Sequence, residues 1–324
     1  MIERGVTRPR FALVGAGSMG RNHARIIAEN PKTELAYIVD PFREGAQPIA
    51  ERFGATWVPE LDAASDVDAV VVAASTEHHY DIAQQVIARG LPMLIEKPVC
   101  PSLSQTLEIV EATEKAGIPL MCGFLERFNP AVVVARKLAS EPLFIRAERH
   151  SPYAPRIKTG VAWDLLVHDV DLIAQFFGGQ DPAHANVEVG FFHPESVKGA
   201  EDVVEASLSF PGGGIASASA SRIGQLKVRQ LTVQSLTEMV EVDLLRRGVT
   251  VYRHTTIDAD AQGGSGFRQA TEMEVPEVVG PEPLAAQLVR FLGLVDGTVD
   301  VDAERRSIIP AHRIVDEALS QSRH

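Results

Sequence analysis

The fold is decided by the stretch Phe11-Ala12-Leu13-Val14-Gly15-Ala16-Gly17-Ser18-Met19-Gly20, in which a short apolar run leads into glycines spaced GxGxxG. Residues 21–29 follow with the pattern of a helix. Between a strand and a helix, this glycine pattern is typical of a loop that binds the pyrophosphate of a dinucleotide. Gly15 permits the tight turn, Gly17 lets the pyrophosphate approach the backbone, and Gly20 lets helix and strand pack closely. We therefore expect a Rossmann domain, with the phosphates at the helix N-terminus.

A carboxylate follows the next predicted strand, residues 35–39. Asp40 lies twenty residues beyond Gly20, where an acidic residue accepts hydrogen bonds from the adenosine ribose and repels a 2′-phosphate. The sequence therefore favours NAD over NADP, although Arg43 is a nearby cation that could accommodate the phosphate. Ser18, Met19 and Arg43 join Asp40 and the three glycines among the expected cofactor contacts.

Two later apolar runs, residues 69–74 and 93–95, read as parallel strands buried on both faces. The first ends at Ser75-Thr76-Glu77-His78-His79 and the second at Glu96-Lys97-Pro98. Ligands of an open parallel sheet lie beyond the carboxyl ends of its strands, so both loops should border the cofactor. The expected contacts there are Ser75, Thr76, His79, Glu96 and Lys97. The adjacent histidines predict no metal site, because neighbouring side chains diverge and no third ligand accompanies them.

The second half of the chain contains a polar stripe on an apolar helix, Trp163 to Asp171. At about 100° per residue, Asp164, His168 and Asp171 fall on one side of that helix. An imidazole flanked by carboxylates could be a general base held in one tautomer. The structural alternative is a core helix whose polar groups cap or bond the nearby backbone, since ion-pair networks also produce such stripes.

Lys97 is the second candidate for chemistry. At the end of a strand that faces the nicotinamide, a desolvated lysine can donate to a reacting hydroxyl and stabilise the alkoxide that forms as hydride leaves. The alternative is a surface lysine paired with Glu96.

Composition limits the other possibilities. The chain has 324 residues, 45% of them hydrophobic and 23% charged, which suffices for two domains of ordinary size. Its formal net charge of -12 argues against a nucleic-acid or anionic-membrane partner. Cys100 and Cys122 have neither disulfide-framework nor thiolate-metal spacing. With no secretory leader and no apolar run of about 18 residues, we expect a soluble, cytoplasmic protein.

Three motifs in this order resemble the Gfo/Idh/MocA family of nicotinamide-dependent oxidoreductases, over essentially the whole chain. They are the glycine loop, Glu96-Lys97-Pro98, and the stretch from Asp164 to Asp171. The resemblance implies a Rossmann domain followed by an α/β domain with a large open, mainly antiparallel sheet. It also implies that Lys97, Asp164 and His168 match the family's catalytic lysine, aspartate and histidine. Glu77 departs from the family pattern, because proline is common at its place.

Within the family, residues 123–130 and 155–161 look most like the UDP-N-acetylglucosamine 3-dehydrogenase type, although the stretch from Asp164 to His168 also resembles myo-inositol dehydrogenases. The cationic and stacking groups that could hold a nucleotide diphosphate are Arg127, Arg149, Tyr153 and Arg156. The alternative is an arginine-capped surface loop. The expected substrate contacts are Lys97, Arg127, Asn129, Tyr153, Arg156, Asp164 and His168.

The domain boundary is expected between residues 122 and 123, so that residues 123–324 form the substrate-binding domain. From residue 185 short alternating runs predict an antiparallel sheet, with hairpin turns at residues 211–214 and 246–248. Helices should cover one face, which leaves the other for a homodimer or homotetramer. Residues 258–266 read as a flexible loop or hairpin tip. Residues 282–294 and 304–320 read as helices, and the last could pack back on the first domain.

The predicted function is an NAD-dependent dehydrogenase that oxidises a secondary hydroxyl of a sugar, with a nucleotide sugar as the expected substrate. His168 would take the hydroxyl proton, Lys97 would donate to the substrate oxygen, and Asp164 would support both. Asp169 and Asp171 are assigned to structure, and no metal is required. The alternatives are a myo-inositol or free monosaccharide dehydrogenase and a non-catalytic protein that senses NAD and sugar.

Overall fold

The computed structural model describes residues 8–258 and 267–321, which divide into two units. The first unit extends to Leu125 and also takes in Leu284–His312, while the second comprises Glu126–Pro283 and the described residues from Arg313 on. The expected boundary at residues 122 and 123 lies a few residues before this division. Residues 284–312 return to the first unit because they supply it with core contacts: the ring of Phe291 packs edge-on against Phe11, with centroids 6.1 Å apart.

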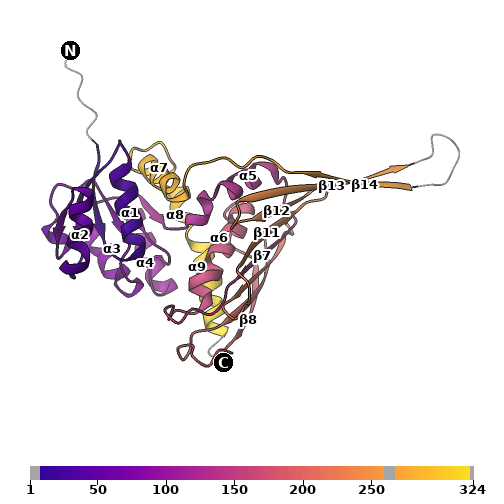
Figure 1. The fold of residues 1–324 in the computed structure, drawn as a ribbon, viewed down its shortest axis with the longest axis horizontal. Helices are drawn as coiled ribbons and strands as arrows, with labels where there is room; N and C mark the ends of the chain where they lie inside the picture. Colours follow the sequence, from indigo (N-terminus) through magenta and orange to yellow (C-terminus); the bar gives the residue numbers. More distant parts are fainter. Residues whose placement is uncertain (1–7, 259–266, 322–324) are drawn as a thin grey trace, which may run out of the picture. The chain divides into compact units, whose positions relative to one another are not determined.

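Sheet A of the first unit is fully parallel, with strand order β3-β2-β1-β4-β5-β6. This order confirms the predicted Rossmann domain. Strands β1, β4, β5 and β6 are largely buried and apolar because helices cover both faces, whereas the edge strand β3 is partly exposed. The strands are β1 (Arg10–Val14), β2 (Glu34–Val39), β3 (Thr56–Val58), β4 (Ala69–Val72), β5 (Met93–Ile95) and β6 (Leu120–Cys122). Figure 1 shows the accompanying helices α1 (Ser18–Glu29), α2 (Arg43–Phe53), α3 (His79–Ala88) and α4 (Leu103–Ala116).

Sheet B of the second unit has strand order β14-β13-β12-β11-β7-β10-β9-β8. The pairing of β7 with β10 is parallel and the other described pairs are antiparallel, which confirms the expected sheet. Both predicted hairpin turns are present, with positive φ at Gly212, Gly213 and Arg247. The strands are β7 (Phe144–His150), β8 (His184–Gly190), β9 (Val203–Ser209), β10 (Ile215–Ser221), β11 (Val228–Gln234), β12 (Met239–Asp243), β13 (Gly248–Asp258) and β14 (Phe267–Glu274).

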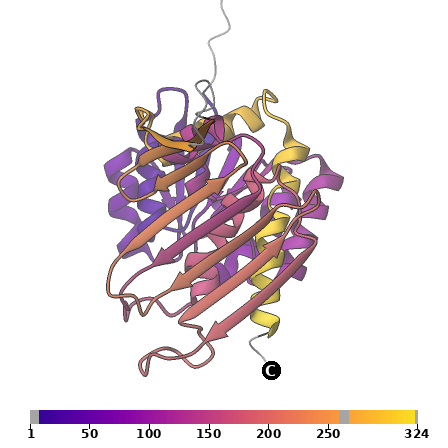
Figure 2. The ribbon, with the colours of Figure 1, turned by 90° about the vertical axis from the view of Figure 1, so that its right-hand side faces the viewer.

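The two faces of sheet B differ. Helices α5 (Pro130–Leu138) and α6 (Val167–Phe176) pack on one face, where α5 contacts β12 and β13 and α6 contacts β7 and β10. Figure 2 looks onto the other face. Arg146 on β7 and Glu205 on β9, which alternate with buried residues of their strands, are exposed. Strands β13 and β14 extend beyond their neighbours as an arm (Figure 1).

The C-terminal helical region differs from the prediction. The helix expected over residues 304–320 is wrong, because the chain forms α8 (Val301–Arg306) and α9 (Ile309–Gln321), which follow α7 (Pro283–Val295). Pro310, the second residue of α9, explains the break, since proline lacks an N–H donor and is best tolerated in the first turn of a helix. Residues 259–266, most of the segment predicted as a loop or hairpin tip, lie outside the described residues. Within the parts of the chain that the structure describes, no helix has the length and apolarity to cross a membrane.

Candidate active site

The glycine loop between β1 and α1 needs its glycines for different reasons. Gly15 has φ +98°, and a Cβ there would lie 2.5 Å from the backbone nitrogen of Ala74. A Cβ on Gly20 would lie 2.0 Å from the carbonyl oxygen of Gly15. A Cβ on Gly17 would meet nothing within 4 Å. Gly15 and Gly20 therefore let strand, loop and helix pack, while Gly17 leaves open space above the backbone.

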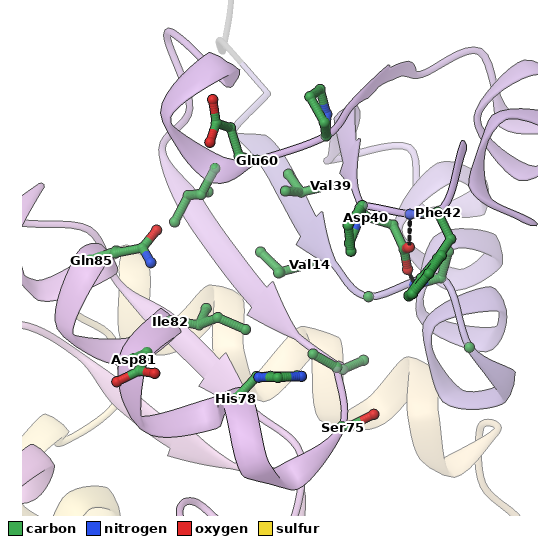
Figure 3. A pocket seen from close by; sticks show the side chains of 18 of the residues that line it. Val14, Val39, Asp40, Phe42, Glu60, Ser75, His78, Asp81, Ile82 and Gln85 are labelled. Carbon is green, nitrogen blue, oxygen red and sulfur yellow. Dashed lines mark hydrogen bonds between the residues drawn. The ribbon is translucent and has the colours of Figure 1, made fainter. Parts of the chain in front are cut away.

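A cavity of about 650 Å³ opens over this loop (Figure 3). It lies beyond the carboxyl ends of β1 and β4, at the point where the strand order of sheet A reverses, which is the usual ligand position in this fold. Its size is in the range of small-molecule and cofactor sites. Its lining includes Gly15, Gly17, Ser18, Asp40, Phe42, Ser75, His78, Asp81, Ile82 and Gln85.

Asp40 ties the end of β2 to the glycine loop. Its Oδ2 accepts a hydrogen bond from Ala16 N at 2.8 Å, and its Oδ1 accepts one from Phe42 N at 2.8 Å. Each carboxylate oxygen keeps a further lone pair, so the group can still accept from a ribose hydroxyl. Arg43 lies outside the cavity lining, with its guanidinium 5.1 Å from the centroid of the Trp57 ring. Asp40 therefore lines the cavity, whereas Arg43 lies outside the lining and contacts the Trp57 ring.

The loop after β4 places its two histidines differently. His78 lines the cavity, whereas His79 is buried beneath it. The ring nitrogens of His79 lie 2.9 Å from the carbonyl oxygen of Pro98 and 3.0 Å from that of Ala74. His79 therefore joins this loop to the Lys97-Pro98 segment. Several expected cofactor contacts are not part of the cavity lining: Met19, Gly20, Arg43, Thr76, His79, Glu96 and Lys97.

Glu96 is held inside the first unit. Its Oε1 lies 2.7 Å from Nε2 of His23 on α1, and both side chains are buried. A Cβ on Gly123 would lie 2.7 Å from Oε2 of Glu96, so only glycine leaves room for the carboxylate. This pair connects α1 and the end of β5, directly before Lys97. Lys97 itself is partly exposed, between buried neighbours.

The predicted helix in the second unit begins with a π-helical turn, Ala162–Leu166, and continues as α6. The prediction of a regular α-helix throughout is therefore wrong for the first turn; such π turns are frequent at functional sites. Within Trp163–Asp171, all of which the structure describes, Asp164 and His168 are partly exposed and the other residues are buried. This stretch thus presents one carboxylate and one imidazole outward.

The other carboxylates of this helix pair with arginines. Asp171 accepts from Arg127 Nε at 2.8 Å and Nη2 at 2.5 Å. Asp169 accepts two hydrogen bonds of 2.8 Å from Arg149, whose Nη1 donates to Glu126 at 3.0 Å. These contacts anchor α6 to β7 and to the 3₁₀ turn Leu125–Phe128.

The buried Arg149 side chain, 2% exposed, shapes the charges around it. Its burial works to lower the pKa of Arg149, but the carboxylates of Asp169 and Glu126 raise that pKa above its ordinary value. Burial alone would raise the pKa of Glu126, yet the charge of Arg149 lowers it. Burial raises the pKa of Asp169, and Arg149 opposes this shift. Arg149 is therefore a fixed positive charge beneath the helix.

The expected substrate residues of the second unit have varied surroundings. Asn129 caps α5 through Ala131 N at 3.2 Å, and its amide donates to Leu244 O at 3.2 Å. The ring of Tyr153 stacks on His193, with centroids 3.6 Å apart, and its hydroxyl donates to Glu195 O at 2.7 Å. Arg156 is exposed on the loop before the π turn. Asn129 thus has a structural role, and Tyr153 fixes the conformation of a loop.

Glu201 is a residue that no sequence motif marks. Its Oε1 accepts a hydrogen bond from Ala162 N at 2.7 Å, at the start of the π turn. A Cβ on Gly160 would lie 2.1 Å from the Glu201 carboxylate, so the glycine lets the carboxylate reach the helix N-terminus. Burial raises the pKa of Glu201. This buried carboxylate fixes where the helix with Asp164 and His168 begins.

Family comparison agrees with this geometry. Residues 9–124 match the model of an oxidoreductase family with an NAD-binding Rossmann fold, and residues 136–235 match the GFO/IDH/MocA C-terminal domain. The chain belongs to the Gfo/Idh/MocA family. This confirms the resemblance stated from the motifs, together with the predicted fold and enzyme class: the protein is an NAD-binding oxidoreductase that acts on CH–OH groups.

Several Gfo/Idh/MocA proteins are similar along most of the chain. UDP-N-acetylglucosamine 3-dehydrogenase from Acidithiobacillus ferrooxidans is 26% identical over 289 residues, 88% of each chain. Its solved structure superposes with a TM-score of 0.82 at 25% identity, covering 96% of this chain and 98% of that one. Inositol 2-dehydrogenase from Rhizobium meliloti is 22% identical over 322 residues, 96% of each chain.

A further Gfo/Idh/MocA-like fold was solved with bound cofactor. It is an oxidoreductase from Agrobacterium radiobacter in complex with NAD+, L-tartaric acid and magnesium, with a TM-score of 0.83 at 17% identity, covering 97% of each chain. At this identity the likeness concerns the fold alone.

Proposed function

We propose that this Gfo/Idh/MocA protein is an NAD-dependent dehydrogenase that oxidises a secondary hydroxyl of a nucleotide-linked sugar to a ketone. The observation that carries the proposal is the helix from Trp163 to Asp171, in which Asp164 and His168 are the partly exposed residues. Arg127 and Arg149 bind the two other carboxylates of this helix, Asp171 and Asp169, which are buried.

In the proposed reaction, His168 takes the proton of the substrate hydroxyl as general base. Lys97 donates a hydrogen bond to the same oxygen and stabilises its developing negative charge. Asp164 supports the charge of both groups, and Glu201 fixes the start of its helix. Bound NAD supplies the hydride acceptor. The glycine loop and Asp40 would hold it, since Gly17 leaves open space and the carboxylate keeps acceptor capacity for a ribose.

The similarity to UDP-N-acetylglucosamine 3-dehydrogenase supports a nucleotide sugar as substrate. A second candidate, a free cyclitol such as myo-inositol, is favoured by the similarity to inositol 2-dehydrogenase over nearly the whole chain. The presence of both Lys97 and His168 argues against a non-catalytic sensor.

The test is the rate of NADH formation with UDP-N-acetylglucosamine and with myo-inositol, repeated with NADP. We expect turnover of the nucleotide sugar with NAD and little with NADP. Turnover of myo-inositol without turnover of the nucleotide sugar would replace the proposed substrate by the second candidate. Absence of turnover with both would contradict both.

We also infer that copies of this chain associate through the open face of sheet B as a homodimer or homotetramer, and that the protein works in the cytoplasm. The support for association is a broad eight-stranded sheet with described helices on one face (Figure 2). Light scattering of the purified protein tests this, and a monomeric mass would contradict it.

A further inference from the structure

Two arginines face each other on the helix-covered side of sheet B. Arg229 on β11 lies directly opposite Arg149 on β7 in the strand register. Like charges at directly opposed positions destabilise a sheet. Arg149 is compensated, because Asp169 and Glu126 accept hydrogen bonds from its guanidinium. Among the residues that the structure describes, the ion-pair partner of Arg229 is distant: its Nη1 lies 3.6 Å from Oε1 of Glu126, the atom that already accepts from Arg149.

Arg229 is also the less buried of the two. Its side chain is 31% exposed, and within residues 8–258 and 267–321 its guanidinium makes no hydrogen bond. Burial and the charge of Arg149 lower the pKa of Arg229, while the carboxylates of Glu126, Asp169 and Asp164 raise it. The strand register places Arg229 beside Arg149, which binds Asp169 on the helix that also carries Asp164. A guanidinium that is 31% exposed and makes no hydrogen bond to the described residues has donors available to water or to a bound anion.

We propose that Arg229 binds the anionic oxygens of the substrate and so selects a phosphate- or carboxylate-bearing sugar over a neutral one. The inference rests on the proposed function, because it places the anion beside Asp164. A guanidinium suits this role, since its planar donors bind phosphate or carboxylate in pairs. A neutral cyclitol would offer it no charged partner. The two sources of the anion are the diphosphate of a nucleotide sugar and the carboxylate of a sugar acid.

The test compares Arg229→Met and Arg229→Lys on four substrates: UDP-N-acetylglucosamine, its 6-carboxylate (uronate) form, N-acetylglucosamine and myo-inositol. We expect Arg229→Met to lower kcat/KM for the anionic substrates by about 10- to 100-fold, through KM, because charge-assisted hydrogen bonds are lost. The kcat/KM for the neutral substrates should not change. Arg229→Lys should recover part of the loss, since lysine keeps the charge without the paired donors.

Arg246→Met is the matched control. Arg246 lies in the hairpin turn between β12 and β13 of the same sheet, 89% exposed and 3.0 Å from Asp243. This variant should leave kcat/KM for all four substrates unchanged. A loss with Arg229→Met for both nucleotide sugars assigns the anion to the diphosphate, and a loss confined to the uronate assigns it to the carboxylate.

Equal losses for neutral and anionic substrates would overturn the inference, since Arg229 would then act by positioning Asp164. No loss with any anionic substrate would also overturn it. If the wild-type protein oxidises none of the four substrates, the proposed function fails. The inference about Arg229 is then tested by calorimetric titration of substrate binding. Binding of UDP-N-acetylglucosamine to the NAD-loaded protein that is weakened in Arg229→Met supports the inference, whereas undetectable or unchanged binding overturns it.

Discussion

Asp169→Asn tests whether the buried ion pairs hold the catalytic helix in place. Asp169 accepts two hydrogen bonds of 2.8 Å from Arg149, which is 2% exposed. Asparagine has nearly the same shape but one acceptor oxygen and no charge. The loss of one charge-assisted bond costs about 1.5–3 kcal/mol, and removing one partner of a buried ion pair costs about 3–5 kcal/mol. Because Glu126 still binds Arg149, we expect a loss of about 3 kcal/mol in the free energy of unfolding.

The assay is urea unfolding followed by tryptophan fluorescence in a Trp57→Phe background. The chain has two tryptophans, Trp57 in the first unit and Trp163 in the first turn of the helix, so this background reports on the second unit alone. Glu274→Gln is the control, because it removes an exposed ion pair with Arg253 in the same unit, and such pairs contribute little. If Asp169→Asn shifts the unfolding midpoint no further than Glu274→Gln, the buried pair does not stabilise the helix and the reasoning is refuted.

Three further predictions concern the cofactor site and the helix start. Gly20→Ala should weaken NAD binding at least about tenfold in a fluorescence titration, since a Cβ 2.0 Å from Gly15 O forces the loop to move; unchanged affinity would contradict this. Asp40→Ser should raise kcat/KM for NADP by about tenfold by removing the repulsion of a 2′-phosphate; an unchanged preference would show that Asp40 does not select NAD. Because burial raises the pKa of Glu201 in the folded state, the stability that its protonated form contributes is present below the ordinary pKa of about 4.3 and is lost as pH rises through the raised value. Glu201→Gln, which keeps the acceptor for Ala162 N–H, should therefore gain stability over the wild type in urea unfolding as the pH rises above the ordinary pKa of about 4.3; a difference that is constant with pH would contradict this.

The first unit could be predicted because its signals are local. The GxGxxG loop joins a strand to a helix, and Asp40 follows the next strand at the expected distance. The structure adds the directions of the side chains, which the spacing of residues in the sequence does not give. Adjacent residues at a helix start diverge by about 100°, and the sequence did not indicate that His78 would reach the cavity while His79 turned inward.

In the second unit, the polar residues of the helix were predictable but their partners were not. Asp171 shares a stripe with Asp164 and His168 in a regular α-helix, and its burial depends on Arg127, which is distant in sequence. The π turn arises where Glu201 meets Ala162 N, a contact between segments about 40 residues apart, which no helical periodicity reports. Arg229 lies in an alternating strand without any motif, so only its register opposite Arg149 distinguishes it.

The central claim is tested most directly by the initial rate of NADH formation from UDP-N-acetylglucosamine in the wild type and in the double variant His168→Ala, Lys97→Met. We predict turnover by the wild type and a loss of at least about 10²-fold in the double variant, because general acid–base catalysis contributes about 10²–10⁴-fold. NADH binding, followed by fluorescence, should be retained in both. Turnover that survives in the double variant would contradict the proposed mechanism.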